Sequence, residues 1–382
     1  MLNMGGSGSK KIIGLMSGTS HDGVDAAVVE ITDTAGDNAL KTDLLYHIHK
    51  KYPEKLRIKI RAAFSGNTET ICRLNFELGE FFALCVNQLI AGCGIKKDDI
   101  AVVASHGQTI YHIPPIGGKG GSTLQIGESS IIAARTGLAV VSDFRPKDMA
   151  YGGQGAPLVP IADYLLFSKP GVVRAVVNIG GMANATILNG NIENTVAFDT
   201  GPGNSLIDEM IVLKTNGKLS FDNGGGIARN GTPDKRLLSE LLSHPYLRKK
   251  PPKSTGRETF GRALSENICN RYRDLRYDDL ISTLTHFTAK TIFNSIKPYR
   301  PVEVIVTGGG VRNEFLMELI SSMFLPEGAD VKNISEYGIP PEAKEAVSFA
   351  IIGYRTLKGL PGNVPSATGA LSGTILGKLT LP

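Results

Sequence analysis

The chain has 382 residues, of which 42% are hydrophobic and 20% are charged. These proportions are ordinary for a globular protein, and the length exceeds what one core usually supports, so two domains are expected. The net charge of +5 is small and scattered along the chain. It gives no reason to expect nucleic acid as a partner, and it suits weak steering of an anionic small substrate.

Cysteine usage and the N-terminal residues indicate the compartment. The four cysteines form no CxxC pair and have no histidine at metal-ligand spacing, so we expect reduced core residues. Residues 1–10 lack the apolar segment of a signal peptide, and no uninterrupted apolar run reaches membrane-spanning length. These features favour a cytoplasmic protein that does not enter the membrane.

The first motif lies between two apolar strands within residues 11–30. Small residues at 17–20 let phosphate oxygens approach backbone N–H groups closely. Asp22 and Asp25 are suited to hold Mg²⁺, directly or through water, or to orient a substrate hydroxyl. The alternative is a plain β-hairpin turn. Two acids in a loop of this composition favour function.

Two polar residues follow predicted strands further along. His106 comes directly after the apolar strand 100–105, and it is either part of a ligand cleft or a satisfied core histidine. Residues 139–143 form another strand, and a Gly/Pro-rich segment follows as the expected hinge between domains. Arg145 lies in that segment. Its guanidinium suits a hydroxyl pair or a carboxylate, and a surface salt bridge is the alternative.

The second half of the chain repeats the layout of the first. Residues 172–186 read as strand, the turn Gly180–Gly181 and a returning strand, as in the first hairpin. This pattern indicates an internal duplication. Asp199 then follows an apolar strand and precedes a Gly-rich turn and a helix, where α/β sheets bind ligands and helix N–H groups attract anions. The alternative is that Asp199 caps a turn.

Two further features lie near the C-terminus. The predicted strand 302–306 runs into Gly308–Gly310 and then a helix, and such a turn lets backbone pack flat against a purine or a phosphate. A ligand-free loop is the alternative. The last helix, 341–357, carries Glu345 outside its apolar stripe.

The three loops together indicate a class of chemistry. The chain has no GxxxxGK[ST] sequence and no HRD or DFG element, so it is neither a P-loop protein nor a protein kinase. Loops without lysine leave backbone N–H groups and Mg²⁺ to neutralise a triphosphate, with one Asp as the base. The residues therefore predict a two-domain, ATP-dependent small-molecule kinase, or an ATPase of the same design.

Several motifs resemble those of the anhydro-N-acetylmuramic acid kinases, in the family's order: GLMSGTSHDGVD, SHGQT, DFRPKDMAYGGQGAPLVP, NIGGMANAT, FDTGPGN, VTGGGVRN and PSATGA. The resemblance spans roughly residues 11–375. It implies an α/β, duplicated two-lobe actin/hexokinase-like (ribonuclease H-like) fold with a central cleft between the lobes. It also implies ATP and Mg²⁺ as cofactors, a homodimer, and no nucleic-acid or membrane partner. We expect lobe I at 1–142 plus 352–382 and lobe II at 143–351.

The same resemblance implies site residues. Asp199 takes the position of the catalytic base, and the sugar contacts are Arg145 and Glu345, with Asp22 and His106. Asp22 and Asp25 are the implied metal ligands. His21 stands where an apolar residue is common in the family, and we expect no effect because its side chain need not face the phosphates. The residues assigned to ATP are Gly18, Thr19, Ser20, His21, Asp22, Gly23, Val24, Asp25, Gly180, Gly181, Gly201, Gly308, Gly309, Gly310 and Asn313.

The implied reaction opens a 1,6-anhydro ring while phosphorylating O6. With an ordinary pKa of about 4, Asp199 would be ionised and could take a proton from water attacking C1. The C1–O6 bond then breaks and O6 attacks the γ-phosphorus, so no second carboxyl is needed to protonate the leaving oxygen. Two rival functions are a kinase for levoglucosan, another 1,6-anhydrosugar, and an actin-like nucleotide switch with no sugar substrate.

Overall fold

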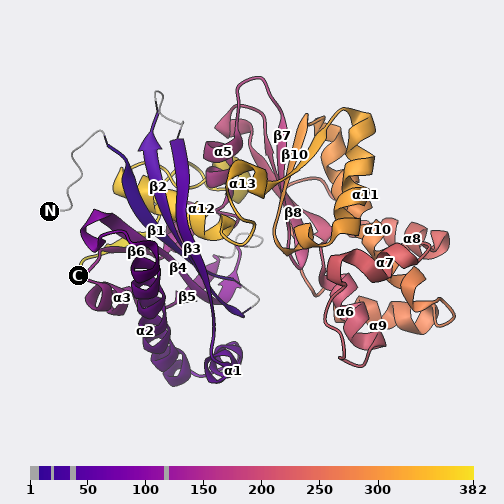
Figure 1. Ribbon diagram of the computed structural model, residues 1–382, viewed down its shortest axis with the longest axis horizontal. Coiled ribbons are helices and arrows are strands. Elements are labelled where there is room, and N and C mark those ends of the chain that lie inside the picture. The colour runs from indigo at the N-terminus through magenta and orange to yellow at the C-terminus, as the bar shows by residue number, and fades with distance from the viewer. Residues whose placement is uncertain (1–7, 19–20, 35–39, 116–119) are drawn as a thin grey trace. The chain divides into compact units, whose positions relative to one another are not determined.

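The computed structural model describes residues 8–18, 21–34, 40–115 and 120–382. The chain forms two compact units (Figure 1). Unit 1 comprises Met1–Leu166 with Gly338–Pro382, and unit 2 comprises Phe167–Tyr337. The sequence-based boundaries were 142/143 and 351/352. The structure instead keeps helix α12 (Lys344–Leu357) with unit 1, because α12 packs against strands of the unit 1 sheet.

Unit 1 is built on one sheet with the strand order β12-β6-β4-β1-β2-β3, and β5 pairs with the outer part of β4. Strands β1, β2 and β3 are antiparallel neighbours, whereas β4 and β6 continue the sheet parallel to β1. The strands are β1 (Lys10–Ser17), β2 (Gly23–Asp33), β3 (Leu40–Lys51), β4 (Ile100–Ile113), β5 (Ser122–Ile126), β6 (Val140–Ser142) and β12 (Lys378–Thr380).

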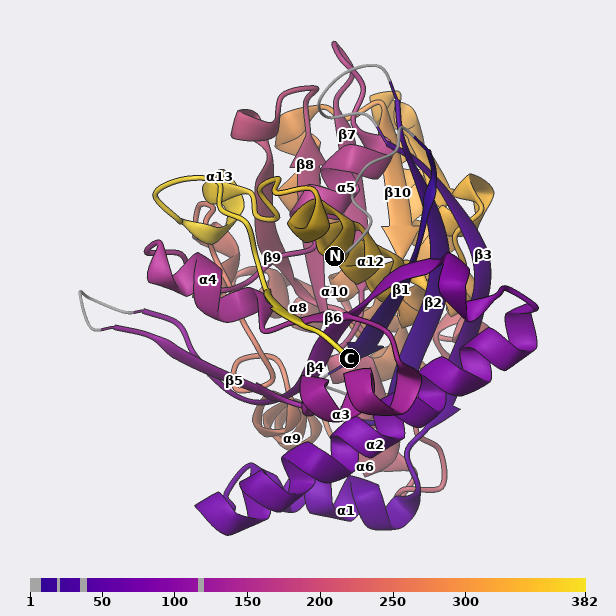
Figure 2. The same cartoon turned by 90° about the vertical axis from the view of Figure 1, so that its left-hand side faces the viewer.

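Helices cover both faces of this sheet (Figure 2). Side chains alternate along a strand, so Leu15 and Val103 face the core under α2, whereas Gly14 lies against α12. A Cβ on Gly14 would lie 1.9 Å from the carbonyl oxygen of Ala346, so only glycine lets α12 approach this closely. The unit 1 helices besides α12 are α1 (Glu54–Ala63), α2 (Thr68–Cys93), α3 (Ser129–Thr136), α4 (Phe144–Ala150), α5 (Pro160–Phe167) and α13 (Pro365–Thr368).

Helix α2 is the longest helix of the described chain. The Asn67 side chain caps its first turn by accepting from the Thr70 N–H, and Gly94 ends it in the left-handed conformation. By length and composition alone α2 would be long and apolar enough to cross a membrane. Its apolar face, which includes Leu78 and Phe82, is buried in the core of unit 1.

Unit 2 repeats the topology of unit 1. Its strand order is β11-β10-β7-β8-β9, with β7, β8 and β9 antiparallel and β10 and β11 parallel to β7. Read from its other edge, the unit 2 sheet has the order β9-β8-β7-β10-β11, which corresponds strand for strand to β3-β2-β1-β4-β6 in unit 1. This confirms the predicted duplication. The strands are β7 (Arg174–Ile179), β8 (Met182–Leu188), β9 (Val196–Pro202), β10 (Glu303–Thr307) and β11 (Asp330–Asn333).

Two apolar clusters stabilise unit 2. The first lies between the sheet and helices α10 (Tyr277–Ile296) and α11 (Glu314–Phe324). The second lies among the shorter helices and is centred on Phe260 and Phe287, both fully buried. These shorter helices are α6 (Ser205–Lys214), α7 (Gly226–Asn230), α8 (Lys235–Leu242) and α9 (Arg262–Arg271).

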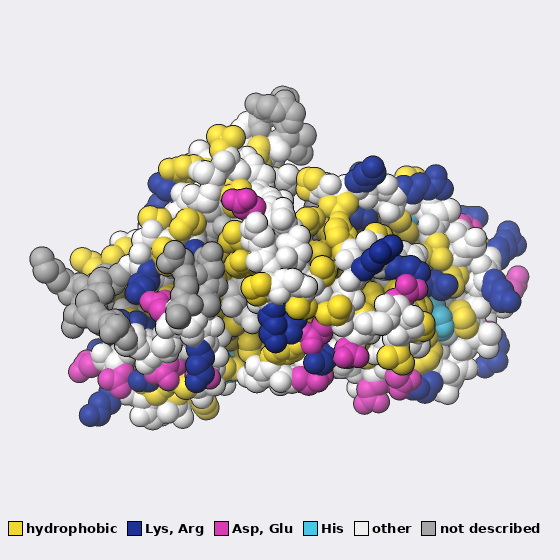
Figure 3. Space-filling view, turned by 90° about the horizontal axis from the view of Figure 1, so that it is seen from above, with side chains coloured by type: hydrophobic (Ala, Val, Ile, Leu, Met, Phe, Trp, Pro, Cys, Tyr) yellow, Lys and Arg dark blue, Asp and Glu magenta, His cyan; other side chains and the backbone are white. Residues whose placement is uncertain are grey.

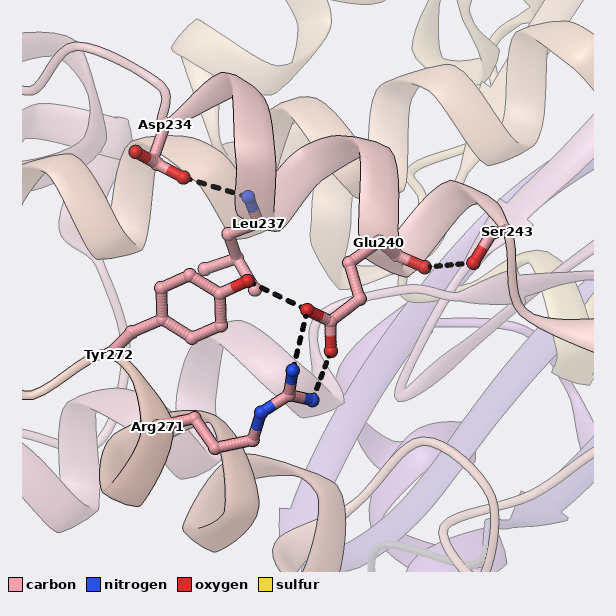
Figure 4. Close-up of polar contacts among 6 residues, drawn as sticks. All are labelled: Asp234, Leu237, Glu240, Ser243, Arg271 and Tyr272. Atoms are coloured by element: carbon pink, nitrogen blue, oxygen red, sulfur yellow. Dashed lines mark hydrogen bonds and ion pairs between the residues drawn. The ribbon is translucent and has the colours of Figure 1, made fainter.

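Polar contacts hold α8 against the end of α9 (Figure 4). Asp234 caps α8 by accepting from the Leu237 N–H at 2.7 Å. Glu240 accepts from both terminal nitrogens of Arg271 and from the Tyr272 hydroxyl at 2.7 Å. A bidentate pair of this kind uses the whole guanidinium edge, so Arg271 has a structural role.

In both units, the carboxyl ends of the parallel strands lie at one edge of the sheet. In unit 1 these strands are β1, β3, β4 and β6, and in unit 2 they are β7, β9, β10 and β11. Ligands of α/β sheets bind at such edges. On the face in Figure 3, basic and acidic side chains are interspersed rather than gathered by sign.

Candidate active site

The turn between β1 and β2 is held by side chains from two other strand ends. The Ser17 hydroxyl is 2% exposed, donates to Gln108 Oε1 at 2.6 Å and accepts from the Tyr52 hydroxyl at 2.8 Å. Gln108 Nε2 in turn donates to the Gly18 carbonyl at 3.5 Å, and the Tyr52 N–H donates to the Asp22 carbonyl at 2.9 Å. Tyr52 carried no signal in the sequence, because only the fold brings the end of β3 beside the end of β1.

The residues predicted to bind phosphate in this turn are only partly described. Thr19 and Ser20 lie outside the residues that the structure describes. His21 has a positive φ of 53°, and its ring lies 4.8 Å from the ring of Phe64, which agrees with the expectation that it need not face the phosphates. Gly18 accepts from the His21 N–H at 3.4 Å, which closes the turn.

Gly23 and Val24, which are also assigned to ATP, have structural roles in the unit 1 sheet and its core. A Cβ on Gly23 would lie 2.4 Å from the Lys50 carbonyl oxygen, so glycine is needed for β2 to approach β3. The Val24 side chain is 1% exposed and belongs to the apolar core of unit 1. The Val24 side chain is thus not available to a nucleotide, and the assignment of this residue to the ATP site stays a prediction.

Asp25 lies on β2 beside two histidines of β3. Its Oδ1 lies 3.0 Å from His49 Nδ1 and 3.3 Å from His47 Nε2. Asp22 is exposed at the turn. Within the part of the chain that the structure describes, no three or more His, Cys, Asp or Glu side chains are arranged to hold a metal ion. The metal assignment of Asp22 and Asp25 stays a prediction.

Arg145 is held by His106. Its Nε donates to His106 Nε2 at 3.0 Å, and its Nη1 donates to the Gly155 carbonyl at 3.1 Å. Burial, together with the charge of Arg145, lowers the pKa of His106 to about 3, so the ring is neutral. Since Nε2 accepts, the proton sits on Nδ1 and is donated to the Gly107 carbonyl at 2.8 Å. Both ring nitrogens are occupied, so His106 orients Arg145, and its sugar contact stays a prediction.

Arg145 and Glu345 influence each other electrostatically. Burial lowers the pKa of Arg145 to about 10, and the charge of Glu345 partly opposes that shift. Burial also raises the pKa of Glu345, and the Asp25 charge adds to this, whereas Lys344 and Arg145 lower it. Lys344 lies at the start of α12 and pairs with Asp163 at 2.7 Å in a buried ion pair. This pair anchors the end of α12 from which Glu345 projects.

A buried carboxylate holds the backbone that receives Arg145. Asp148 is fully buried and accepts from the Gly155 N–H at 2.8 Å. It also accepts from Asn363 Nδ2 at 2.7 Å and from the Thr368 hydroxyl at 2.8 Å. The C-terminal segment that contains Asn363 and Thr368 is thus tied to the segment that carries Arg145.

In unit 2, the turn Gly180–Gly181 caps the start of α6. The Gly181 carbonyl accepts from the N–H groups of Gly203 and Ser205 at 2.9 and 3.0 Å, and the Gly180 carbonyl accepts from the Asn204 N–H at 2.8 Å. The sequence predicted that free N–H groups at this helix start would attract an anion. That prediction is wrong for these three groups, because they already have partners.

The glycine turn Gly308–Gly310 lies beside the turns that follow β7 and β9 in the same unit. Gly308 has a φ of 84°, and a Cβ on it would lie 2.5 Å from Asn178 Oδ1 at the end of β7. A Cβ on Gly309 would find Asn204 Nδ2 as its nearest neighbour, at 4.0 Å. The turns after β7, β9 and β10 therefore meet at one edge of the sheet, and Gly309 has open space beside it.

Gly201 and Asn313 have local roles in the same unit. Gly201 has a φ of 154° in β9 and lies against Thr291 of α10. Asn313 caps α11, since its Oδ1 accepts from the Leu316 N–H at 2.9 Å. A nucleotide contact for either residue stays a prediction. Because Asn313 Oδ1 already accepts from Leu316, its side chain would contact a nucleotide through the amide nitrogen.

Asp199 lies within β9, because this strand continues to Pro202, whereas the sequence predicted that the strand ends just before Asp199. The pairing of β8 with β9 shifts register beside it, and such a bulge redirects a side chain. Its Oδ2 accepts from the Thr255 N–H at 2.8 Å, its own N–H donates to the Lys253 carbonyl at 3.0 Å, and its carbonyl accepts from the Tyr246 hydroxyl at 2.8 Å. Sequence reasoning missed these three residues, because they lie some fifty positions further along in a segment without a recognisable motif.

The environment raises the pKa of Asp199 to about 6, mainly by burial, whereas the Thr255 N–H and the Lys253 charge act in the opposite direction. The sequence led us to expect an ordinary pKa of about 4, and that expectation was wrong. The carboxylate is still mostly ionised at neutral pH. A carboxylate with a pKa close to the working pH is typical of a general base.

The repeated strand order and the glycine turns at the carboxyl edge of the unit 2 sheet define the class of this protein. It has a duplicated ribonuclease H-like fold of the actin/hexokinase type. A sequence model described as anhydro-N-acetylmuramic acid kinase matches residues 10–382, and the chain belongs to this family.

Two named relatives show the same likeness in sequence. A protein named anhydro-N-acetylmuramic acid kinase from Caldanaerobacter subterraneus subsp. tengcongensis is 44% identical over 97% of this chain and 96% of its own length. A protein of the same name from Bacillus cereus (strain Q1) is 40% identical over 97% of this chain and 99% of its own length. A solved structure, the activator of 2-hydroxyisocaproyl-CoA dehydratase from Clostridium difficile with bound ADPNP, aligns with a TM-score of 0.44 at 12% identity, covering 91% of this chain and 96% of that chain.

Proposed function

We propose that this protein is an ATP-dependent kinase that hydrolytically opens the 1,6-anhydro ring of anhydro-N-acetylmuramic acid and phosphorylates O6. The products are N-acetylmuramic acid 6-phosphate and ADP, and the reaction serves peptidoglycan recycling. The observation that carries the proposal is Asp199, a partly buried carboxylate of β9 with a raised pKa, in a chain of this family. We also propose that the protein acts in the cytoplasm as a homodimer and that it binds neither nucleic acid nor membrane.

Asp199 is the base in this reaction. It takes a proton from water as the water oxygen bonds to C1, the C1–O6 bond breaks, and O6 attacks the γ-phosphorus while ADP leaves. The Thr255 N–H at 2.8 Å holds one carboxylate oxygen, so the other, Oδ1, is the oxygen that receives the proton. One carboxylate suffices because the phosphoryl group captures the leaving oxygen, a task that needs a second acid in ordinary glycosidases.

Arg145 and Glu345 are the proposed sugar contacts. His106 and the Gly155 carbonyl occupy two donor positions of the guanidinium, Nε and Nη1. Nη2 donates to neither of these partners and is suited to a carboxylate or hydroxyl oxygen. Anhydro-N-acetylmuramic acid carries a lactyl carboxylate that levoglucosan lacks, so a prepositioned guanidinium favours the former substrate. Asp22 is assigned beside them from the exposed turn of unit 1.

The glycine turns are the proposed nucleotide site, with Gly18 and Gly180–Gly181 at the phosphates and Gly308–Gly310 at the adenosine. The donor set suits Mg²⁺ held largely by ATP itself, because Mg²⁺ commonly takes one or two carboxylates, phosphate oxygens and water. Asp22 is exposed and would supply such a carboxylate, while two histidines already contact Asp25. When bound, Mg²⁺ neutralises phosphate charge. The cleft between the lobes stays a prediction.

The test is a product analysis in heavy-oxygen water. The purified protein is incubated with ATP, Mg²⁺ and anhydro-N-acetylmuramic acid, and a parallel reaction contains levoglucosan. We expect a 6-phosphate that carries the solvent oxygen at C1, with ADP formed in equal amount. Levoglucosan as the better acceptor would assign the protein to the other anhydrosugar. ATP hydrolysis without any dependence on sugar would favour a nucleotide switch instead.

A further inference from the structure

Arg257 lies against the glycine turn between β7 and β8. A Cβ placed on Gly181 would lie 3.7 Å from Arg257 Nη2 and 3.8 Å from its Nε, so the guanidinium lies over the open side of this glycine. Arg257 is exposed, and among the described residues its guanidinium has no hydrogen-bond or ion-pair partner. Nothing in the described part of unit 2 therefore occupies its donors.

The backbone that carries Arg257 is fixed on both sides. Upstream, the Thr255 N–H donates to Asp199, the proposed base. Downstream, Phe260 is fully buried, and its carbonyl accepts from the Ser205 hydroxyl at 2.8 Å at the start of α6. One short segment thus contacts the proposed base and the helix that the glycine turn caps. Its one arginine points at the turn without contributing to the core.

Three other exposed arginines of this unit have a different role. Arg271 forms the bidentate pair with Glu240 (Figure 4), Arg229 pairs with Glu318 at 2.7 Å, and Arg262 pairs with Glu266 at 2.8 Å. Each of these guanidinium groups is held by a carboxylate. Arg257 has only a longer-range attraction to Asp208, whose pKa it lowers while burial raises that pKa to about 7.

A phosphate group bound at this turn would need a cationic side chain from elsewhere in the chain. Gly180 and Gly181 carry no side chains, and their carbonyls point at the start of α6, so the turn has no charge of its own to place against a phosphate. A guanidinium presents a planar fork that matches two phosphate oxygens. Arginines placed at transferring phosphoryl groups stabilise the charge that develops there.

We propose that Arg257 is a phosphate-binding catalytic residue that contacts the phosphate chain of ATP at the Gly180–Gly181 turn and stabilises the transferring phosphoryl group. The inference rests on the proposed function, because it assumes that this turn binds the nucleotide. It supplies the cationic side chain that the lysine-free loops of the sequence lack.

The test compares Arg257→Gln and Arg257→Lys with Arg273→Gln, which removes the same charge from an exposed arginine of the same unit. We measure kcat and KM for ATP and for the anhydro sugar, the affinities for AMPPNP and adenosine by calorimetry, and the melting temperature. For Arg257→Gln, kcat/KM for ATP should fall on the order of 10²–10³-fold. AMPPNP affinity should fall while adenosine affinity and the melting temperature stay unchanged. Arg257→Lys should lie between, because it keeps the charge but not the fork.

The outcomes separate this inference from the proposed function. If the wild-type protein does not phosphorylate the sugar, the proposed function fails, and the AMPPNP and adenosine titrations still test Arg257. If the wild-type protein is active and Arg257→Gln matches Arg273→Gln in every measurement, Arg257 has no role at the phosphates. Equal loss of AMPPNP and adenosine affinity, or a lower melting temperature, would assign Arg257 a structural role and overturn the inference.

Discussion

The first hairpin turns of the two units occupy the same place in the same strand order, yet they are stabilised in different ways. In unit 1, the turn after β1 is held by side chains, through the chain from Tyr52 to Ser17 to Gln108. In unit 2, the turn after β7 is held by its own carbonyls, which cap α6, and Arg257 lies on its open side. A shared topology places both turns at a ligand-binding edge, and the residues around each turn then decide its chemistry.

The largest expected effect tests whether unit 2 carries the base. Asp199→Asn removes the proton acceptor and keeps the side-chain shape, so turnover should fall by about 10³-fold or more while ATP affinity changes little. Steady-state kinetics and nucleotide titration measure the two quantities. Asp274→Asn changes an exposed aspartate of the same unit and should behave as wild type. Substantial turnover by Asp199→Asn would remove Asp199 from the mechanism.

The next effect tests whether unit 1 carries the sugar contact. Arg145→Met removes the guanidinium that His106 and Gly155 orient, so KM for the anhydro sugar should rise on the order of 10²-fold while KM for ATP stays the same. Arg73→Met, at an exposed arginine of α2, is the matched control. A rise confined to KM for ATP would move Arg145 to the nucleotide site.

The pH dependence sharpens the assignment to Asp199. A base must be deprotonated, so activity is retained above its pKa and lost as the pH falls through it. With a pKa of about 6, kcat/KM for the sugar should be about tenfold lower at pH 5 than at pH 7. A pH-rate profile measures this directly. An acid limb near pH 4 would mean that Asp199 is not desolvated as the structure indicates.

The smallest expected effect tests the side-chain support of the unit 1 turn. Tyr52→Phe removes one buried hydrogen bond to Ser17, which is worth about 1 kcal/mol, so KM for ATP should rise about fivefold. Tyr111→Phe, at a tyrosine that is 56% exposed, should leave KM unchanged. If both variants match wild type, the network does not position the turn for nucleotide binding.

Local patterns were sufficient for much of the candidate site. Strands β4 and β9 continue past His106 and Asp199, so the strand ends predicted at these residues were wrong. The two apolar hairpins predicted the duplication, and Gly308 directly follows β10 at the carboxyl edge of its sheet, as predicted. These predictions held because strand periodicity and glycine-rich turns are properties of neighbouring residues. The hydrogen bond between His106 and Arg145 was not predicted, because a sequence does not show which distant side chains will face each other.

The sequence by itself determined the family, the α/β class and the positions of the glycine turns, because motif order and local conformation are written in consecutive residues. Only the tertiary structure decided what surrounds them. Burial raises the pKa of Asp199, and residues more than fifty positions away contact the base and the turn: Thr255 contacts Asp199, and Arg257 lies over Gly181. Desolvation and contacts between distant segments arise only when the chain is packed, so neither could be predicted from spacing along the chain.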